Sequence, residues 1–143
     1  MIAIDTNLLV YAHRSGVPEH AAARAAIERA ANSGRGWGIA APCLAEFWSV
    51  VTHPSATGRP SEPGEAQGFV RSLVEDGGAR LWRPGPGFGR RLLQIAADLA
   101  VSGIRIFDLQ IALTAFDNGA AELWTQDRNF TTVPGLAVEH PLN

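Results

Sequence analysis

The chain has 143 residues, of which 46% are hydrophobic and 18% are charged, as in one globular domain with a single sizeable core. Its net charge of -2 excludes an overall basic field of the kind that attracts nucleic acid. The single cysteine, Cys43, excludes an internal disulfide and a cysteine-rich zinc site, and its apolar neighbours predict a buried thiol.

The sequence opens with a short apolar stretch, residues 2–4, that we interpret as a buried strand. Asp5 stands at its carboxyl end, and Thr6 and Asn7 turn the chain into a helix. The apolar positions of that helix are Leu8, Leu9, Tyr11 and Ala12. Ligands of open α/β sheets bind outside the carboxyl ends of the strands, so we expect Asp5 in a functional crevice. The alternative is that Asp5 only caps the helix.

Helices and short strands alternate along the rest of the chain. We expect helices at residues 19–31, 42–51, 65–75, 88–101 and 108–117, and strands at residues 37–41, 79–82, 122–125 and 136–138. The apolar stripe expected to be buried on the helix at 88–101 is Leu92, Leu93, Ile95, Ala96 and Leu99. The apolar side of the helix opened by Asp108 is Leu109, Ala112, Leu113 and Phe116.

This alternation predicts an α/β fold with a mostly parallel sheet. The proline- and glycine-rich segment 54–64 is a loop that is too short to link two domains, and the sequence holds no internal repeat. We therefore interpret residues 1–143 as a single domain.

The sequence has no sign of membrane insertion or export. No apolar run approaches the ~20 residues that cross a bilayer, and the N-terminus lacks a basic stretch followed by an apolar one. We expect a cytoplasmic protein without membrane contact.

Four of the 14 acidic residues stand at unusual places. Asp5 and Asp127 follow predicted strands, Asp108 begins a helix after an apolar pair, and Glu46 lies inside an apolar helix. In a parallel sheet all four can reach one edge, where ligands bind. Each also has a plainer interpretation: Asp108 as a helix cap, Asp127 in an Asx turn with Asn129, and Glu46 on a solvated helix edge.

Carboxylates that lie close together repel one another unless a cation sits among them or some are protonated. The sequence offers no histidine near these acids and no cysteine cluster, so the ligands are all oxygen. Such a site selects Mg²⁺ or Mn²⁺ over zinc. These ions also bind substrate phosphate and activate water, so the pattern predicts phosphodiester hydrolysis.

Taken together, the motifs resemble those of PIN-domain ribonucleases, and more narrowly VapC-type toxins of bacterial toxin–antitoxin pairs. The motifs that carry the resemblance are Asp5-Thr6-Asn7, Glu46 in its apolar helix, residues 108–112 (DLQIA) and residues 125–130 (TQDRNF). Shorter matches at residues 52–54, 83–86 and 134–136 extend it over nearly the whole chain.

This resemblance implies a three-layer α/β/α sandwich, usually dimeric, with Mg²⁺- or Mn²⁺-dependent endoribonuclease activity on tRNA or ribosomal RNA. It also implies a small VapB-like antitoxin whose tail covers the acidic groove. By position, the acidic catalytic and metal-binding residues are Asp5, Glu46, Asp108 and Asp127, and the supporting polar residues are Asn7 and Thr125.

Two positions depart from the family pattern. Asn129 stands where the family often has a second acid after Asp127, so the site carries less charge for a metal ion. Leu109 stands where a smaller residue is common, so we expect a narrower pocket.

Other residues have less specific roles. The four tryptophans (Trp37, Trp48, Trp82 and Trp124) are expected mostly in the core rather than stacked on bases. Arg128 is expected to contact phosphate or solvent, and Arg35, Arg59 and Arg105 are loop residues within possible reach of RNA. The four histidines (His13, His20, His53 and His140) are scattered and do not form a metal set.

Two other functions compete with the nuclease hypothesis. A phosphatase or receiver-like domain with Asp5 as phosphoryl acceptor is disfavoured, because such folds commonly use a lysine and this chain has none. A catalytically silent PIN module that binds RNA or protein is disfavoured by the four retained acids.

Overall fold

The structure is a computed structural model that describes residues 1–56 and 58–143. One parallel sheet runs in the order β3-β2-β1-β4-β5. Its strands are β1 (Ile2–Ile4), β2 (Trp37–Ala40), β3 (Arg80–Trp82), β4 (Glu122–Trp124) and β5 (Ala137–Glu139). The helices are α1 (Thr6–His13), α2 (His20–Ala31), α3 (Ala41–Thr52), α4 (Pro63–Glu75), α5 (Phe88–Asp98) and α6 (Arg105–Asp117). The predicted loop at 54–64 includes residue 57, which lies outside the described residues.

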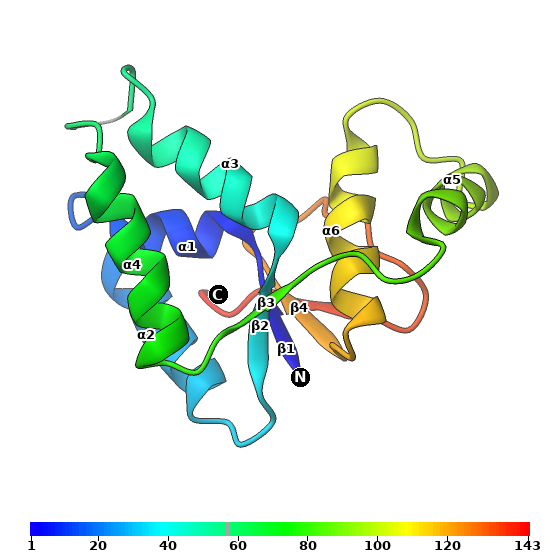
Figure 1. The fold of residues 1–143 in the computed structure, drawn as a ribbon, viewed down its shortest axis with the longest axis horizontal. Coiled ribbons are helices and arrows are strands. Elements are labelled where there is room, and N and C mark those ends of the chain that lie inside the picture. The colour runs from blue at the N-terminus through cyan, green and yellow to red at the C-terminus, as the bar shows by residue number, and fades with distance from the viewer. Residues whose placement is uncertain (57) are drawn as a thin grey trace.

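Helices cover both faces of this sheet (Figure 1). The group α1, α2, α3 and α4 packs on one side, and α5 and α6 pack together on the other. Helix α3 contacts both α1 and α6, so it closes the edge where the two helical layers meet. The predicted α/β fold, with three layers and a parallel sheet, is confirmed.

The central strand explains why the N-terminal stretch is so apolar. All three residues of β1 are buried, because β1 lies between β2 and β4 and under helices on both faces. Ile2 pairs with Trp37 of β2 and with Glu122 of β4 in parallel register. The carboxyl ends of β1 and β4 therefore lie side by side, which is where the site forms.

Several helices and strands begin or end at other residues than the sequence predicted. Helix α6 begins at Arg105 rather than at Asp108, which lies in its first turn, where the helix dipole favours an acid. Helix α4 begins at Pro63 rather than at Glu65, because proline suits a first turn and Glu62 and Glu65 form a capping box. Strand β4 ends at Trp124, so Thr125 and Asp127 lie in the following loop.

The buried stripe predicted for α5 is confirmed only in part. Leu92, Ile95 and Ala96 are half-buried and pack against the core, whereas the other two predicted positions are exposed. No residue of this helix is fully buried, and Leu93 is 68% exposed and Leu99 46% exposed. Helix α5 lies at the outside of the molecule and packs on α6 alone among its larger contacts (Figure 1). Phe116 of α6 is also 40% exposed, whereas Leu109, Ala112 and Leu113 are buried as expected.

The tryptophans divide between core and surface. Trp37 and Trp82 are buried, as predicted. Trp48 is 42% exposed, and Trp124 is partly buried with the Arg29 guanidinium 5.9 Å from the centre of its ring. Cys43 is fully buried, as its apolar neighbours indicated.

Candidate functional site

The four predicted acids line one open hollow of about 400 Å³ at the carboxyl ends of β1 and β4. We call it the acidic hollow; its lining is Asp5, Thr6, Asn7, Val10, Tyr11, Glu46, Val50, Asp108, Ile111 and Asp127. These residues come from Asp5 and the helix α1 that follows it, from α3, from the first two turns of α6 and from the loop after β4. Four segments far apart in sequence therefore reach one place because the parallel sheet brings their ends together.

Asp5 is the most enclosed of these acids, with 6% of the residue exposed. Its Oδ1 accepts a hydrogen bond of 2.8 Å from the Thr6 amide, so Asp5 does cap α1, as the alternative interpretation proposed. Its Oδ2 accepts from the Thr125 hydroxyl at 2.7 Å and from the Asn7 amide group at 3.4 Å. The cap and the place in the hollow are thus properties of the same side chain.

Asn7 and Thr125 form the polar support that the sequence predicted beside Asp5. The Asn7 side-chain amide donates to the Thr125 hydroxyl at 2.9 Å, and its carbonyl accepts from the Gln126 amide at 3.1 Å. The Thr125 hydroxyl also accepts from the Asp127 amide at 3.0 Å. These bonds fix the loop after β4 against the start of α1.

The environment of Asp5 opposes its ionisation. The pKa of Asp5 is raised to about 6, first because burial penalises the charged carboxylate. Hydrogen bonds from Thr125 and Thr6 act in the opposite direction, and the negative charges of Glu46 and Asp108 raise the pKa further. A cation placed among these carboxylates would remove that penalty.

The acids of the hollow are arranged as two linked pairs. Thr6 links the first pair, because its amide donates to Asp5 and its hydroxyl donates to Oε2 of Glu46 at 2.8 Å. Arg105 links the second pair, because its Nη1 lies 3.1 Å from Oδ2 of Asp108 and 3.3 Å from Oδ2 of Asp127. The pKa of Arg105 is raised above its ordinary value, chiefly by the bond to Asp108.

The structural interpretations of Asp127, Asp108 and Glu46, as turn, cap and solvated-edge residues, are confirmed for some of these acids and not for others. Oδ1 of Asp127 accepts from the Asn129 amide at 2.9 Å, so the predicted Asx turn is present. Asp108 is not a helix cap, since Ile104 holds that position, and its carboxylate instead accepts from the Thr131 amide at 3.2 Å. Glu46 is an exposed residue, as the solvated-edge interpretation proposed, yet it faces the hollow.

The donor set of the hollow fits a hard divalent cation. Among the described residues, no three His, Cys, Asp or Glu side chains approach closely enough to make a complete ligand set. Mg²⁺ is usually held by one or two carboxylates together with waters and substrate phosphate. Paired carboxylates around an open hollow suit that kind of site, and all-oxygen ligands suit Mg²⁺ or Mn²⁺ better than zinc.

The roles of three residues in or near the site were missed or misjudged from the sequence. Thr6 is more than a turn residue, because it links two acids. Arg105 was expected in a loop, but its position three residues before Asp108 in α6 is a spacing that favours an ion pair. Leu109 does not narrow the pocket, because it is fully buried in the core and the wall is made by Ile111.

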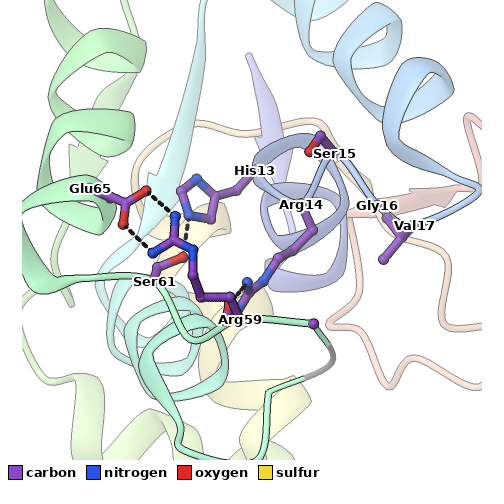
Figure 2. A pocket seen from close by; sticks show the side chains of 9 residues that line it. His13, Arg14, Ser15, Gly16, Val17, Arg59, Ser61 and Glu65 are labelled. Carbon is purple, nitrogen blue, oxygen red and sulfur yellow. Dashed lines mark hydrogen bonds and ion pairs between the residues drawn. The ribbon is translucent and has the colours of Figure 1, made fainter.

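Arg59, one of the three arginines expected within reach of RNA, lines a second hollow at the end of α1 (Figure 2). Arg59 forms a two-pronged ion pair with Glu65, with distances of 3.1 and 3.2 Å. Arg14 donates to the carbonyls of Val51 and Arg59, and His13 lies 2.8 Å from the Ser61 hydroxyl. These bonds tie the end of α1 to the loop before α4. In the same way Arg35 pairs with Glu122 at 3.1 Å.

None of the helices in the described part of the chain is both long and apolar enough to span a membrane.

Comparison with known proteins places this chain in a family. The sequence matches the PIN domain family over residues 2–136. It is 36% identical to ribonuclease VapC43 of Mycobacterium tuberculosis over 143 residues, which is 100% of this chain and 97% of that protein. The crystal structure of VapBC2 from Rickettsia felis bound to a promoter DNA fragment is similar, with a TM-score of 0.68, 20% identity, and coverage of 97% of this chain and 98% of that chain. The crystal structure of VapC20 from Mycobacterium tuberculosis, a sarcin-ricin loop cleaving toxin, is also similar. Its TM-score is 0.66 and its identity 12%, and the match covers 91% of this chain and 92% of that chain.

Proposed function

Because the chain belongs to the PIN-domain family and, within it, to the VapC ribonucleases, we propose that the acidic hollow is a metal-dependent active site that hydrolyses RNA. The observation that carries this proposal is that four carboxylates from four separate segments line one hollow. Such an arrangement is electrostatically unfavourable by itself and becomes favourable with a divalent cation.

The residues have distinct proposed roles. Asp5 and Asp108 are the most direct metal ligands, and Glu46 and Asp127 complete the site or act through water. When bound, Mg²⁺ or Mn²⁺ supplies an activated water and offsets charge on the leaving oxygen. Asn7 and Thr125 are positioning residues, because their hydrogen bonds hold the Asp5 carboxylate in one orientation.

We propose a structured RNA, tRNA or ribosomal RNA, as the substrate. The similar protein VapC20 cleaves the sarcin-ricin loop, which supports this class of substrate without identifying the molecule. End-mapping of cellular RNA after brief induction of the protein would identify it.

We further propose that the chain is the toxin of a cytoplasmic toxin–antitoxin pair, with a VapB-like antitoxin and a second copy of itself as partners. The fold similarity to VapBC2 supports an antitoxin partner. Large apolar side chains are exposed on α3 and near the start of α6, where Trp48 is 42%, Phe107 55% and Ile104 78% exposed. Exposed apolar surface of this kind marks protein interfaces. Sedimentation equilibrium would measure the oligomeric state.

Cleavage assays with purified protein test the nuclease proposal. We expect cleavage of RNA with Mg²⁺ or Mn²⁺, none in EDTA, and a loss on the order of 100-fold or more in Asp5→Asn and Asp108→Asn, since even residues that merely orient metal ligands contribute about 10–100-fold. Asp98→Asn on the exposed side of α5 removes the same charge away from the hollow and serves as control. Full activity of Asp5→Asn with added Mn²⁺ would refute the assignment.

A further inference from the structure

Arg105 occupies a central position between two of the acids in the hollow. Its Nη1 lies 3.1 Å from Oδ2 of Asp108 and 3.3 Å from Oδ2 of Asp127. Carboxylate oxygens such as these are also what would hold a hard divalent ion.

This bridge differs from the other ion pairs in the described residues. Arg35, Arg59 and Arg91 each pair with one carboxylate, whereas Arg105 pairs with two. Both partners of Arg105 line the acidic hollow. The shared nitrogen therefore neutralises charge at the place where a metal site is proposed.

The two carboxylates are held in place by more than this arginine. Oδ2 of Asp108 also accepts from the Thr131 amide at 3.2 Å, and Oδ1 of Asp127 accepts from the Asn129 amide at 2.9 Å. If the guanidinium left, these backbone bonds would keep the carboxylates aimed at the hollow. The Arg105 side chain is 40% exposed, so it has room to turn toward solvent or a ligand.

Resting on the function proposed above, we infer that Arg105 is a built-in competitor of the metal ion. In the metal-free protein it neutralises Asp108 and Asp127, and metal binding displaces it from those oxygens. The displaced guanidinium then lies at the rim of the hollow, where it binds a phosphate of the RNA. Arginine suits this exchange, because its planar group binds carboxylates and phosphates with the same geometry.

The inference predicts that loss of the Arg105 side chain changes metal affinity and nucleic-acid affinity in opposite directions. Removal of Arg105 takes away a competing cation, so metal binding becomes tighter. It also takes away a phosphate ligand, so binding of nucleic acid to the metal-loaded protein becomes weaker. Damage to the fold would weaken both, so the opposite signs distinguish the exchange from a merely structural role.

The experiment compares wild type, Arg105→Ala, Arg105→Lys and Arg35→Ala. Arg35 is the matched control, because it also pairs at 3.1 Å and is 43% exposed, but its partner Glu122 lies outside the hollow. Isothermal titration with Mn²⁺ at low ionic strength gives the metal affinity. Fluorescence anisotropy with a ten-residue single-stranded DNA at saturating Mn²⁺ gives the phosphate affinity.

We expect Arg105→Ala to bind Mn²⁺ about three- to tenfold more tightly than wild type, as suits the loss of two partly exposed ion pairs. It should bind the oligonucleotide at least about threefold more weakly. In both affinities Arg105→Lys should lie between wild type and Arg105→Ala. Arg35→Ala should match wild type in Mn²⁺ affinity. The gain in Mn²⁺ affinity should shrink as salt is added.

One outcome would overturn the inference and leave the proposed active site intact. In it, wild type binds Mn²⁺, Asp5→Asn does not, and Arg105→Ala binds Mn²⁺ no more tightly than wild type. Absence of Mn²⁺ binding in wild type and Arg105→Ala alike would overturn both. Mn²⁺ binding in Arg105→Ala alone would be the strongest support for competition.

Discussion

The Thr125 hydroxyl donates a 2.7 Å hydrogen bond to Oδ2 of Asp5, although the two residues are 120 positions apart in the sequence. This bond joins the end of β4 to the end of β1 beside the acidic hollow. Thr125 is fully buried, and its oxygen also accepts from the Asn7 side chain and the Asp127 amide. One hydroxyl therefore holds the carboxylate of Asp5 and the backbone of Asp127, which are parts of two predicted catalytic residues.

Replacement of this hydroxyl tests its role. Thr125→Val keeps the shape but leaves two partly buried donors, the Asn7 amide group and the Asp127 N–H, without their acceptor, so we expect the free energy of unfolding to fall by about 1–3 kcal/mol. The Thr125 bond lowers the pKa of Asp5, so that pKa should rise further in the variant. Denaturant titration measures the first effect, and NMR titration of the carboxyl group measures the second.

Thr114→Val is the matched control for this prediction. Thr114 is equally buried, but its hydroxyl donates only within α6, to the Gln110 carbonyl at 2.8 Å. It should leave the pKa of Asp5 and RNA cleavage close to wild type. A Thr125→Val protein with an unchanged Asp5 pKa would contradict the positioning role.

The raised pKa of Asp5 predicts a specific pH dependence of stability. Its folded pKa of about 6 exceeds the ordinary value of 3.8, so the folded state binds the proton more tightly than the unfolded state. The resulting stabilisation is complete below pH ~4 and is lost as the pH rises through ~6, by about 3 kcal/mol in total.

Chemical unfolding of metal-free protein between pH 4 and pH 8 measures this effect as the difference between wild type and Asp5→Asn. The difference between the two proteins is needed, because Glu65 and Glu122 have lowered pKa values. Their contributions to the pH dependence of stability therefore have the opposite sign to that of Asp5. Parallel curves for the two proteins would show that Asp5 titrates normally.

Much of the site could be predicted because its acids lie in short motifs beside recognisable elements. Asp5 follows a three-residue apolar strand, and the topology of a parallel sheet then places it at the ligand-binding edge. The links between the acids could not be predicted in the same way. The Thr6 to Glu46 bond depends on how α1 packs against α3, which no local pattern specifies.

The errors in the fold have physical causes. The pattern of α5 is amphipathic, but periodicity gives only the apolar side of a helix and not how much protein covers it, so Leu93 was misplaced. The start of α6 was set too late because an acid was taken as its first residue. Gly103, with φ at 60°, lies in the turn directly before α6, and the helix begins at Arg105.

Metal binding should stabilise the folded protein. A ligand that binds only the folded state adds about 2.7 kcal/mol at a concentration 100 times its dissociation constant. We therefore expect Mn²⁺ to raise the melting temperature by several degrees, EDTA to reverse the rise, and Asp108→Asn to reduce it. Differential scanning calorimetry measures the shift. A shift of equal size in Asp108→Asn and wild type would place the ion elsewhere.

One ion pair joins α5 to α6, beside a row of half-buried apolar side chains, and we expect this pair to hold the helix in place. Both terminal nitrogens of Arg91 bind the carboxylate of Asp117 on α6, at 2.7 and 2.8 Å, and no residue of α5 is fully buried. With so little apolar burial, α5 should open before the rest of the fold. In Arg91→Ala we expect faster amide hydrogen exchange over residues 88–98, with β1 and β4 unchanged. Arg90→Ala, which alters the exposed neighbour, is the control, and equal exchange in the two variants would show that apolar contacts with α6 hold the helix instead.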